Sequence, residues 1–494
     1  MPNLTRLNVL FMASEADPLI KVGGLGDVAG SLPRAIRALN SSSNNISVDI
    51  RLVIPYHPKI RNGIYSPKQV AEFPVHSTEG DILAKAFSLE IDGLPVYLIA
   101  GEPIDHETAV YSEDLIADGY KYVFFSLACL ALAKELDWKP DILHANDWHT
   151  AAAVYSLGLQ RLSDAFFSHT ASLLTIHNLP YLGSMTAPAL EAFELPPADT
   201  SDLPPWAQNM ALPLGLLSAD SIVAVSPSYA KEILTEDFGS GLNTFLRAHR
   251  NKIAGILNGL DIERWDPSND AEIPVNFTLD NLESRAANKS TLQQKMGLEV
   301  NARIPILAMV TRMDPQKGVD IAVTALRQLL ISNDVNDHQF QAVFLGTGNP
   351  RLEDSLRQLE QDYPRQICAR ILYDERLSRL IYAGADALLM PSRYEPCGLS
   401  QMIAMRYGCV PIARATGGLS DTIQDASTSN QGSGFLFLNP KPGGLVDAIQ
   451  RAIFVYTRFP HEWQKIQIHG MQQDFSWDRS AQEYLQHYQL LSGK

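Results

Sequence analysis

The sequence predicts an α/β protein made of two doubly wound domains, in which parallel strands alternate with helices. Apolar runs of strand length alternate with amphipathic stretches through the first half of the chain, and the same rhythm begins again near residue 304. The length of 494 residues is also too great for one ordinary hydrophobic core. These observations favour two domains of the same class.

The first half begins with a β-α-β pattern. Leu7–Ala13 is predicted to be a strand, Asp27–Asn40 a helix with one apolar face, and Ser47–Pro55 a second strand. The alternating pattern of Phe73–Gly101 is interpreted as a hairpin laid on the core. Further short strands are predicted at Asp141–Ala145, Ser172–His177 and Ser221–Ser226.

The second half repeats the pattern after Asn258–Asn288, a stretch rich in Asp, Asn and Pro. We therefore place the boundary between the domains at residues 255/256, with the second domain spanning 256–470. Helices are predicted at Ile321–Leu330, Met402–Tyr407 and Trp463–Lys494. Strands are predicted at Ile304–Thr311, Gln341–Leu345, Ala383–Met390 and Gly408–Arg414.

Composition narrows the possible partners. The net charge of −15 argues against binding to nucleic acid or to anionic membranes, which requires a basic surface. The scattered cysteines show neither a disulfide framework nor zinc-ligand spacing, and indicate a reduced interior. We expect neither a signal peptide nor a membrane span of about 20 apolar residues.

Pro391–Gln401 is the most informative motif. It places Glu395 on a turn between a predicted strand and a predicted helix, just before the N–H groups of Gly398 and Ser400. Ligands of open α/β sheets bind outside the carboxyl ends of strands, and helix N-termini favour phosphate. A carboxylate beside a phosphate site indicates sugar chemistry, in which a transient positive charge lies between the two.

Two cations follow another predicted strand. Arg312 and Lys317 lie on either side of a Pro turn at a helix start, an arrangement suited to a diphosphate. The alternative is a solvated surface loop whose cations pair with acidic residues.

A glycine-rich loop, Lys21–Val28, precedes the first predicted helix. Its glycines and lysine suit a phosphate, or they simply turn the chain. Gly24, Gly26 and Ala29 loosely match a dinucleotide fingerprint, but the loop stands well after the strand end at Ala13. NAD binding is therefore disfavoured.

Polar residues also follow strands in the first half. His144–Thr150 and His177-Asn178 suit hydrogen bonding to sugar hydroxyls better than metal binding, because their spacing matches no metal motif. We expect His149 to be the most exposed of these histidines. Tyr373 is free to stack on a base or to pack, and Asn258 alone is no more than a turn residue.

Together these motifs resemble the bacterial glycogen synthase and plant starch synthase family, in order and at matching intervals over nearly the whole chain. The motifs that carry the resemblance are Lys21–Val28, His144–His149, His177-Asn178, Asn258–Asp261, Arg312–Lys317, Pro391–Leu399 and Thr416–Leu419. The resemblance implies a GT-B fold, with two Rossmann-like domains facing a central cleft and a C-terminal helix, 471–494, crossing back to the first. It also implies glucosyl transfer from ADP-glucose, or in some members UDP-glucose, to the non-reducing end of an α-1,4-glucan. That transfer retains configuration and uses neither a metal nor another cofactor.

The resemblance also implies roles for individual residues. Those expected to act in catalysis are Glu395, Arg312, Lys317, His149 and Asp27. Those expected to bind substrate are Lys21, Gly23, Gly24, His177, Asn258, Tyr373, Cys397, Gly398, Leu399, Thr416 and Gly418. Arg312 and Lys317 are expected to neutralise the departing diphosphate, and Tyr373 to stack on the base. Glu395 is expected to orient glucose and not to act as a nucleophile.

Three departures from the family pattern stand out, of which the first and second bear on acceptor or donor preference. Leu182 stands where a glutamine is usual, Pro204–Leu217 lacks the usual Asn and Lys pattern, and Cys409 replaces a common Thr. Two alternatives stay open: a retaining glucosyltransferase that uses UDP-glucose with a small acceptor, and a catalytically silent glucan-binding protein. The resemblance places the chain in the cytoplasm, or in the plastid stroma of a plastid-bearing organism.

Overall fold

The computed structural model describes residues 5–41, 46–106, 109–161, 163–331 and 339–494. The chain forms two compact units. It passes from the first unit to the second at Gly259/Leu260 and returns to the first at Ser476/Trp477. Unit 1 comprises Met1–Gly259 and Trp477–Lys494, and unit 2 comprises Leu260–Ser476. These crossings lie a few residues after the predicted limits at 255/256 and 470/471.

Unit 1 is built on a nine-stranded sheet within the described residues, in the order β3-β4-β5-β2-β1-β6-β7-β8-β9. Its strands are β1 (Thr5–Met12), β2 (Ile46–Pro55), β3 (Lys68–Val75), β4 (Ile82–Ile91), β5 (Leu94–Ala100), β6 (Ile142–Asn146), β7 (Ala171–Ile176), β8 (Ser221–Ala224) and β9 (Ile253–Gly255). The run from β5 to β9 across the sheet is parallel throughout. The predicted parallel strands of the first half are therefore confirmed.

The segment predicted as a hairpin on the core belongs to the sheet itself. β4 pairs antiparallel with both β3 and β5, and β5 pairs parallel with β2. The hairpin prediction is thus right about the antiparallel pairing and wrong about its place. β5, in which the first alternate residues are buried, pairs with the edge of β2 that β1 leaves open, and this pairing makes the hairpin part of the sheet.

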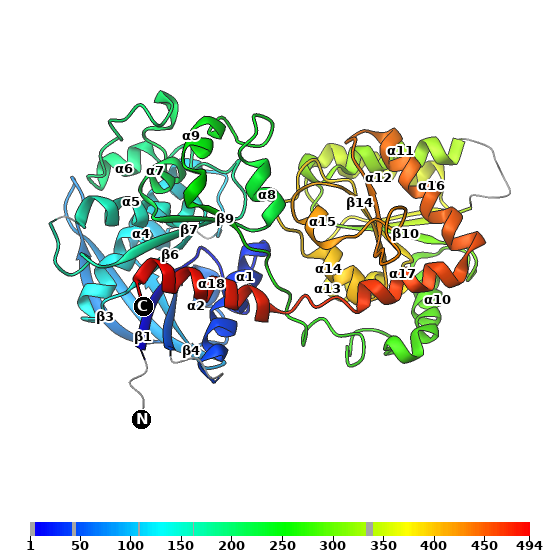
Figure 1. The fold of residues 1–494 in the computed structure, drawn as a ribbon, viewed down its shortest axis with the longest axis horizontal. Helices are drawn as coiled ribbons and strands as arrows, with labels where there is room; N and C mark the ends of the chain where they lie inside the picture. The colour runs from blue at the N-terminus through cyan, green and yellow to red at the C-terminus, as the bar shows by residue number, and fades with distance from the viewer. Residues whose placement is uncertain (1–4, 42–45, 107–108, 162, 332–338) are drawn as a thin grey trace. The chain divides into compact units, whose positions relative to one another are not determined.

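The helices of unit 1 connect and cover these strands (Figure 1). They are α1 (Gly24–Ala38), α2 (Pro58–Arg61), α3 (Glu102–Asp105), α4 (Leu115–Glu135), α5 (Trp148–Gln160), α6 (Ala187–Ala192), α7 (Ala211–Ser218), α8 (Pro227–Glu232), α9 (Asn243–Ala248) and α18 (Trp477–Ser492). By length and composition alone α4 is apolar enough to cross a membrane, which the sequence analysis did not anticipate. In the structure 67% of that apolar stretch is buried, and α4 packs on α5 and α6 as a core helix.

Helix α18 closes the core of unit 1 although it comes from the end of the chain. It packs along α1 (Figure 1), and the side chains of Tyr484 and Tyr488 are fully buried in the core of unit 1. The Tyr488 hydroxyl lies 2.6 Å from Nδ1 of His144, whose Nε2 lies 2.8 Å from Oγ1 of Thr175. Burial holds the pKa of His144 well below its ordinary value, so this ring is neutral and hydrogen bonded at both nitrogens.

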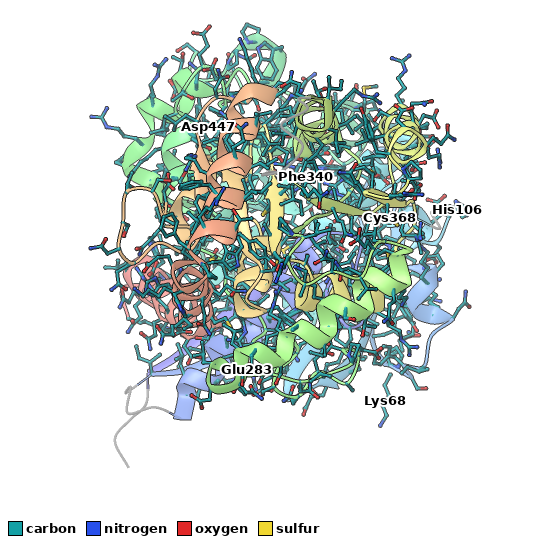
Figure 2. The ribbon with its side chains drawn as sticks, turned by 90° about the vertical axis from the view of Figure 1, so that its right-hand side faces the viewer. Lys68, His106, Glu283, Phe340, Cys368 and Asp447 are labelled. Carbon is teal, nitrogen blue, oxygen red and sulfur yellow. The ribbon has the colours of Figure 1, made fainter. Side chains whose placement is uncertain are left out.

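Unit 2 contains a six-stranded, fully parallel sheet in the part described, in the order β12-β11-β10-β13-β14-β15. Its strands are β10 (Ile306–Val310), β11 (Gln341–Leu345), β12 (Ile367–Arg370), β13 (Ala387–Met390), β14 (Val410–Arg414) and β15 (Phe435–Phe437). Its helices are α10 (Arg285–Met296), α11 (Val319–Ile331), α12 (Pro350–Asp362), α13 (Glu375–Gly384), α14 (Ser400–Arg406), α15 (Gly417–Thr422), α16 (Pro442–Arg458) and α17 (Pro460–Met471). Phe340 and Cys368 lie buried in this unit, whereas Glu283 and Asp447 are exposed (Figure 2).

Two predictions for the second half need correction. The apolar run Ala383–Met390 is not one strand, because Ala383 and Gly384 end α13 and only Ala387–Met390 form β13. An apolar run alone does not distinguish a buried helix end from a strand. The predicted helix Trp463–Lys494 is two helices, α17 and α18, and the break between them contains the crossing at Ser476/Trp477.

Each sheet has a point at which its strand order reverses. In unit 2 the strand numbers fall along the sheet from β12 to β10 and rise from β13 to β15, so the order reverses at the β10–β13 pair. In unit 1 the same reversal falls between β1 and β6. Ligands of open α/β sheets bind outside the carboxyl ends of the strands at such switch points. The topology therefore directs attention to the loops after β1, β6, β10 and β13.

Replacing Tyr488 by phenylalanine tests the packing of α18. The change leaves Nδ1 of the buried His144 without its hydroxyl partner, so we expect a loss of about 1–3 kcal/mol in the free energy of unfolding. Urea denaturation followed by circular dichroism measures it. The control is Leu490→Ala on the same helix, where the side chain is 80% exposed and a change within about 0.5 kcal/mol is expected. Equal effects of the two substitutions would contradict the buried contact.

Candidate functional site

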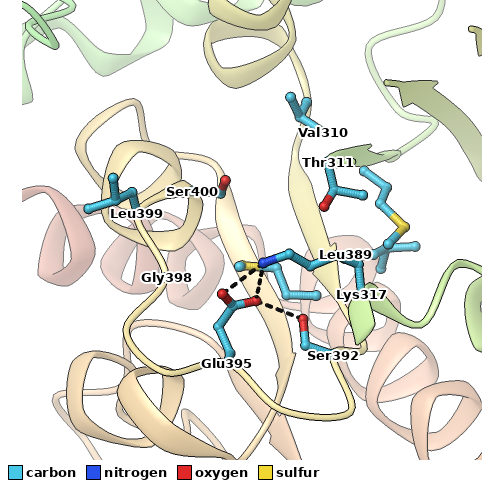
Figure 3. A pocket seen from close by; sticks show the side chains of 11 residues that line it. Val310, Thr311, Lys317, Leu389, Ser392, Glu395, Gly398, Leu399 and Ser400 are labelled. Atoms are coloured by element: carbon cyan, nitrogen blue, oxygen red, sulfur yellow. Dashed lines mark hydrogen bonds and ion pairs between the residues drawn. The ribbon is translucent and has the colours of Figure 1, made fainter. Parts of the chain in front are cut away.

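The switch point of unit 2 brings together the two loops that carry its predicted site residues. Thr311 and Lys317 follow β10, and Ser392, Glu395 and Gly398 follow β13. They line one hollow, together with Leu399, Ser400 and apolar residues of both strands. Because β10 and β13 are neighbours in the sheet, loops separated by about 80 positions in the sequence face one another (Figure 3).

The central contact of this hollow is an ion pair between Lys317 and Glu395. Nζ of Lys317 lies 2.8 Å from each carboxylate oxygen of Glu395, and the hydroxyl of Ser392 donates to Oε2 at 2.9 Å. Figure 3 shows the Lys317 and Ser392 side chains converging on that carboxylate. Only 5% of the Glu395 side chain and 20% of the Lys317 side chain are exposed. The pair is therefore partly withdrawn from water, where charge interactions are stronger than at the surface.

The Lys317 loop is fixed by a short 3₁₀ turn, Pro315–Lys317, and by contacts with the loop after β13. The side chain of Asp314 accepts a hydrogen bond from the N–H of Gln316, and the N–H of Arg393 donates to the carbonyl of Gln316 at 2.7 Å. A Cβ at Gly318 would stand 2.1 Å from the carbonyl oxygen of Pro391. The two loops thus touch through their backbones.

The Glu395 loop is supported from behind by Gly417 and Gly418. The N–H of Gly418 donates to the carbonyl of Glu395 at 3.0 Å, and a Cβ at Gly417 or Gly418 would lie about 2 Å from the carbonyl of Glu395 or Cys397. Thr416 beside them is 1% exposed. This places Thr416 and Gly418, predicted from the sequence to bind substrate, directly behind the carboxylate loop.

The start of α14 provides polar backbone at the same hollow. Gly398 adopts a left-handed conformation, φ +75°, and Leu399 caps a helix of seven residues that begins at Ser400. The first N–H groups of any helix lack acceptors within the helix. Since α14 is so short, these individual N–H groups matter more than an accumulated helix dipole.

Two predicted residues of unit 2 lie outside the buried pair. Arg312 is exposed, and its side chain has no hydrogen bond or ion pair with any residue that the structure describes. Tyr373 is 79% exposed. Both side chains are thus accessible to a ligand. Tyr373 precedes α13, whose N-terminus is capped by Asp374.

In unit 1 the loop after β1 is organised by Glu15, which the sequence analysis missed. Its carboxylate accepts hydrogen bonds from the N–H groups of Val22 and Gly23 and, at 3.0 Å, from the hydroxyl of Tyr111. Glu15 is only 1% exposed, and this burial raises its pKa against the lowering effect of those N–H groups. The glycine loop is therefore folded around a carboxylate.

Lys21 and Asp27 form an ion pair at the mouth of this loop. Nζ of Lys21 lies 2.6 Å from Oδ1 of Asp27, and 29% and 23% of the two side chains are exposed. Gly23 precedes α1, which begins at Gly24. The predicted residues of this loop are thus neighbours in space.

The loops after β6 and β7 meet at Asp147. This residue has φ +55° and precedes α5, and its Oδ1 accepts hydrogen bonds from the N–H groups of His177 at 2.7 Å and Asn178 at 3.3 Å. Burial raises the pKa of Asp147 to about 7. Nε2 of His177 lies 2.9 Å from Oδ1 of Asn146, and burial lowers the pKa of His177 to about 3. Asp147 therefore joins the two predicted histidine motifs.

His149 lies in the first turn of α5, packed against the rings of Tyr111, Tyr122 and Trp148 at centroid distances of 4.2–5.0 Å. It is 7% exposed, while His177 is only half-buried, so the prediction that His149 is the most exposed is wrong. His149 belongs to the first turn of α5 and not to a free turn, and this position packs its side chain among the neighbouring rings. Burial also holds the pKa of His149 well below its ordinary value, so the ring is neutral.

Several buried polar atoms at or near these loops have no hydrogen-bond partner among the residues that the structure describes. They include Nδ1 of His149, Oδ1 of Asn178 and Oδ1 of Asn258. A buried polar group without a partner costs free energy, so such atoms are suited to hydrogen bonds from a ligand or water. Asn258 is 5% exposed and stands just before the crossing between the units.

Sequence reasoning missed Glu15, Tyr111, Asp147 and Ser392. Asp147 was visible within the motif His144–Thr150 and follows a strand, which is the signal that could have identified it. Glu15 also follows a strand, β1, but its role depends on a fold-back of the glycine loop that no local pattern reveals. Across the described ranges, no cluster of three or more His, Cys, Asp or Glu is arranged to hold a metal ion.

Comparison with known proteins identifies the family to which this chain belongs. Residues 8–248 match the family model of the starch synthase catalytic domain, and residues 293–458 match the glycosyl transferases group 1. A glycogen synthase 2 from Nitrosococcus oceani is 40% identical over 98% of this chain and 97% of its own length. A glycogen synthase from Thermotoga maritima is 38% identical over 99% of both.

Solved structures of related proteins have the same fold. The catalytic domain of starch synthase IV from Arabidopsis thaliana, bound to ADP and acarbose, matches over 100% of both chains with a TM-score of 0.85 and 28% identity. Sucrose-phosphate synthase from Thermosynechococcus elongatus shares the fold, with a TM-score of 0.61 and 18% identity. The two parallel-sheet units and their loops define a glycosyltransferase of the GT-B fold. The chain belongs to the glycogen synthase and starch synthase family.

Replacing Asp147 by asparagine tests its buried carboxyl group. Asparagine keeps an acceptor for the His177 and Asn178 N–H groups and tolerates the positive φ. Because the folded chain holds this proton up to about pH 7 and the unfolded chain only to about pH 3.9, wild-type stability should fall with pH relative to the variant. The expected change between pH 4 and pH 7 is up to about 4 kcal/mol. Urea denaturation at several pH values measures it, and a difference independent of pH would refute the assignment.

Replacing Gly417 by alanine tests the backbone support of Glu395. The new Cβ meets the carbonyl of Glu395 at a φ of +44°, so we expect a loss of about 1–3 kcal/mol in the free energy of unfolding. Gly443→Ala in α16 is the matched control. It meets nothing within 4 Å, and it should be neutral or stabilising by up to about 1 kcal/mol. Loss of stability in the control alone would contradict the packing described.

Proposed function

We propose that this chain elongates an α-1,4-glucan at its non-reducing end, transferring glucose from ADP-glucose with retention of configuration. The observation that carries the proposal is the Lys317–Glu395 contact at the switch point of unit 2, with Arg312 accessible on the same loop as Lys317. The glycogen synthases named above support the acceptor, and the neighbour bound to ADP supports the nucleotide. UDP-glucose is the second donor to test. We assign the activity to the cytoplasm, or to the plastid stroma of a plastid-bearing organism.

In this proposal the cations of unit 2 serve the leaving group. Negative charge builds on the diphosphate as the bond to glucose breaks, and preorganised donors at that place lower the barrier. Arg312 offers a planar fork for phosphate oxygens, Lys317 offers a compact charge, and the first N–H groups of α14 offer neutral donors. Tyr373, which is exposed, is assigned to the nucleobase.

Glu395 is assigned to orienting glucose and tempering its positive charge in the transition state. Both of its oxygens contact Lys317 and one also accepts from Ser392, which suits an electrostatic role better than nucleophilic attack. Lys317 then has two partners, the carboxylate and the phosphate, and reduces the repulsion between them.

The neutral, hydrogen-bonding residues of unit 1 are assigned to sugar hydroxyls. The rings of His149 and His177 are uncharged at neutral pH, and His149 and Asn258 each present a buried atom without a partner in the described structure. Lys21, Asp27, Gly23 and Gly24 are assigned to the donor. Hydroxyl groups need such neutral donors and acceptors, whereas phosphate needs charge.

The assignment of Lys317 and Glu395 is tested by Lys317→Ala and Glu395→Gln. Loss of one preorganised charge at a transition state typically costs on the order of 10²–10³ in rate, so each variant should lose that much in kcat. Transfer of radiolabelled glucose to glycogen measures it. Arg327→Ala is the control, because its side chain pairs with Asp362 at the surface of α11 and touches no site residue. Near wild-type kcat in either site variant would refute its role.

The donor and the acceptor are tested together. ADP-glucose and UDP-glucose are each supplied with glycogen and with maltooligosaccharides, and we expect faster chain growth with ADP-glucose. Growth only of a small acceptor with UDP-glucose would favour the alternative transferase. No nucleotide release with any combination would favour a silent glucan-binding protein.

A further inference from the structure

Arg312 depends on its backbone for its position, because its side chain has no partner within the described chain. That backbone is paired with the loop after β11. The N–H of Thr311 donates to Leu345 at 3.0 Å, the N–H of Met313 to Thr347 at 2.9 Å, and the N–H of Asn349 to Met313 at 2.7 Å. The loop after β11, Gly346–Asn349, thus fixes the backbone of residues 311–313 through hydrogen bonds, and we call this loop the template.

The template lies very close to the Arg312 loop. A Cβ at Gly346 would stand 1.8 Å from the carbonyl oxygen of Thr311, and one at Gly348 would stand 2.6 Å from that of Met313. Only glycine allows this approach. A small displacement of the template would therefore displace Arg312 as well.

The carboxylate of Glu353 adds a side-chain contact to the backbone hydrogen bonds that hold the template, among them the one from the N–H of Gly346 to the carbonyl of Arg370 at 3.1 Å. Oε1 of Glu353, in the first turn of α12, accepts from the hydroxyl of Thr347 at 2.7 Å and from the N–H of Gly348 at 2.9 Å. Its other oxygen faces Arg357 at 3.1 Å. The Glu353 side chain is 13% exposed, and the N–H of Gly348, followed by the Thr347 hydroxyl, lowers its pKa. Neither the sequence motifs nor the proposed chemistry gave this residue a task.

We propose that Glu353 is a positioning residue for the transfer reaction, acting through the loop Gly346–Asn349 to hold Arg312 against the diphosphate of the donor. The inference rests on the role proposed for Arg312. Arginine has several rotatable bonds, so a fixed backbone is what limits the positions that its guanidinium samples. Misplacement of about 1 Å by a residue far from the chemistry can cost on the order of 10²-fold in rate.

The test compares Glu353→Ala, Glu353→Gln and Asp354→Ala. Glutamine keeps an oxygen acceptor for Thr347 and Gly348, whereas alanine removes it. Asp354 is the next residue of α12, with a 74% exposed side chain paired to Arg357, and serves as the control.

Binding of ADP alone is measured by calorimetry, and glucosyl transfer to glycogen is measured with ADP-glucose and UDP-glucose. We expect Glu353→Ala to weaken ADP binding about 10-fold and to lower kcat/KM by about 10- to 10²-fold. Glu353→Gln and Asp354→Ala should stay within about twofold of wild type.

A double-mutant cycle with Arg312→Ala separates positioning from general damage. If Glu353 acts through Arg312, Glu353→Ala should have almost no further effect on ADP binding or kcat/KM once Arg312 is gone. Equal factors in both backgrounds would overturn the inference, as would loss of function in Glu353→Gln as severe as in Glu353→Ala. Wild-type behaviour of Arg312→Ala alone would instead overturn the proposed role of Arg312. Wild-type behaviour of Glu353→Ala beside an impaired Arg312→Ala would overturn only the role of Glu353. Thermal midpoints of all variants identify any that are unfolded.

Discussion

The ion pair between Lys317 and Glu395 is the contact on which the site of unit 2 depends. Its two partners come from neighbouring strands, and each would be costly alone, since an uncompensated charge withdrawn from water is strongly destabilising. A carboxylate alone beside the N–H groups of α14 would repel a phosphate bound there. In the proposed function, Lys317 allows the carboxylate and a phosphate to share one hollow. The switch point makes the ion pair possible by placing β10 beside β13.

The polar residues of unit 1 differ from those of unit 2 in their charge. Besides the Lys21–Asp27 ion pair, unit 1 contains buried groups whose uncharged form is favoured: His144, His149 and His177 all have lowered pKa values, and Asp147 has a raised one. Burial without a counter-ion favours the uncharged form of each group. Neutral donors and acceptors discriminate among hydroxyl groups by direction, whereas unit 2 presents charges that attract phosphate at longer range. The proposed division between sugar and diphosphate rests on this contrast in electrostatics.

Local sequence predicted the fold class, most parallel strands and the loops that carry polar residues, because strand period and glycine turns are local signals. It predicted Lys317 and Glu395 as separate features but not their contact, which requires the order of strands in the sheet. It missed Glu15, since that carboxylate acts on a loop that folds back over it. It misjudged His149 for a related reason: the aromatic rings that bury it include Tyr111 and Tyr122, which come from a distant part of the chain. Contacts between residues distant in sequence determine how deeply an ionisable side chain is buried, and burial in turn determines whether it carries a charge.

The loops of unit 2 are also fastened in a way that leaves their charged side chains available. Gly318 lies on the carbonyl of Pro391, Gly417 on that of Glu395, and Gly346 on that of Thr311, each too close for a side chain to intervene. Layers of backbone in direct contact have little room to shift, because close-packed interiors have few voids to move into. These backbone contacts act together with side-chain contacts such as that of Glu353 to keep the loops in place, and the Arg312 side chain is left accessible. Gly318, Gly417 and Gly346 therefore set the distance between one loop and the next.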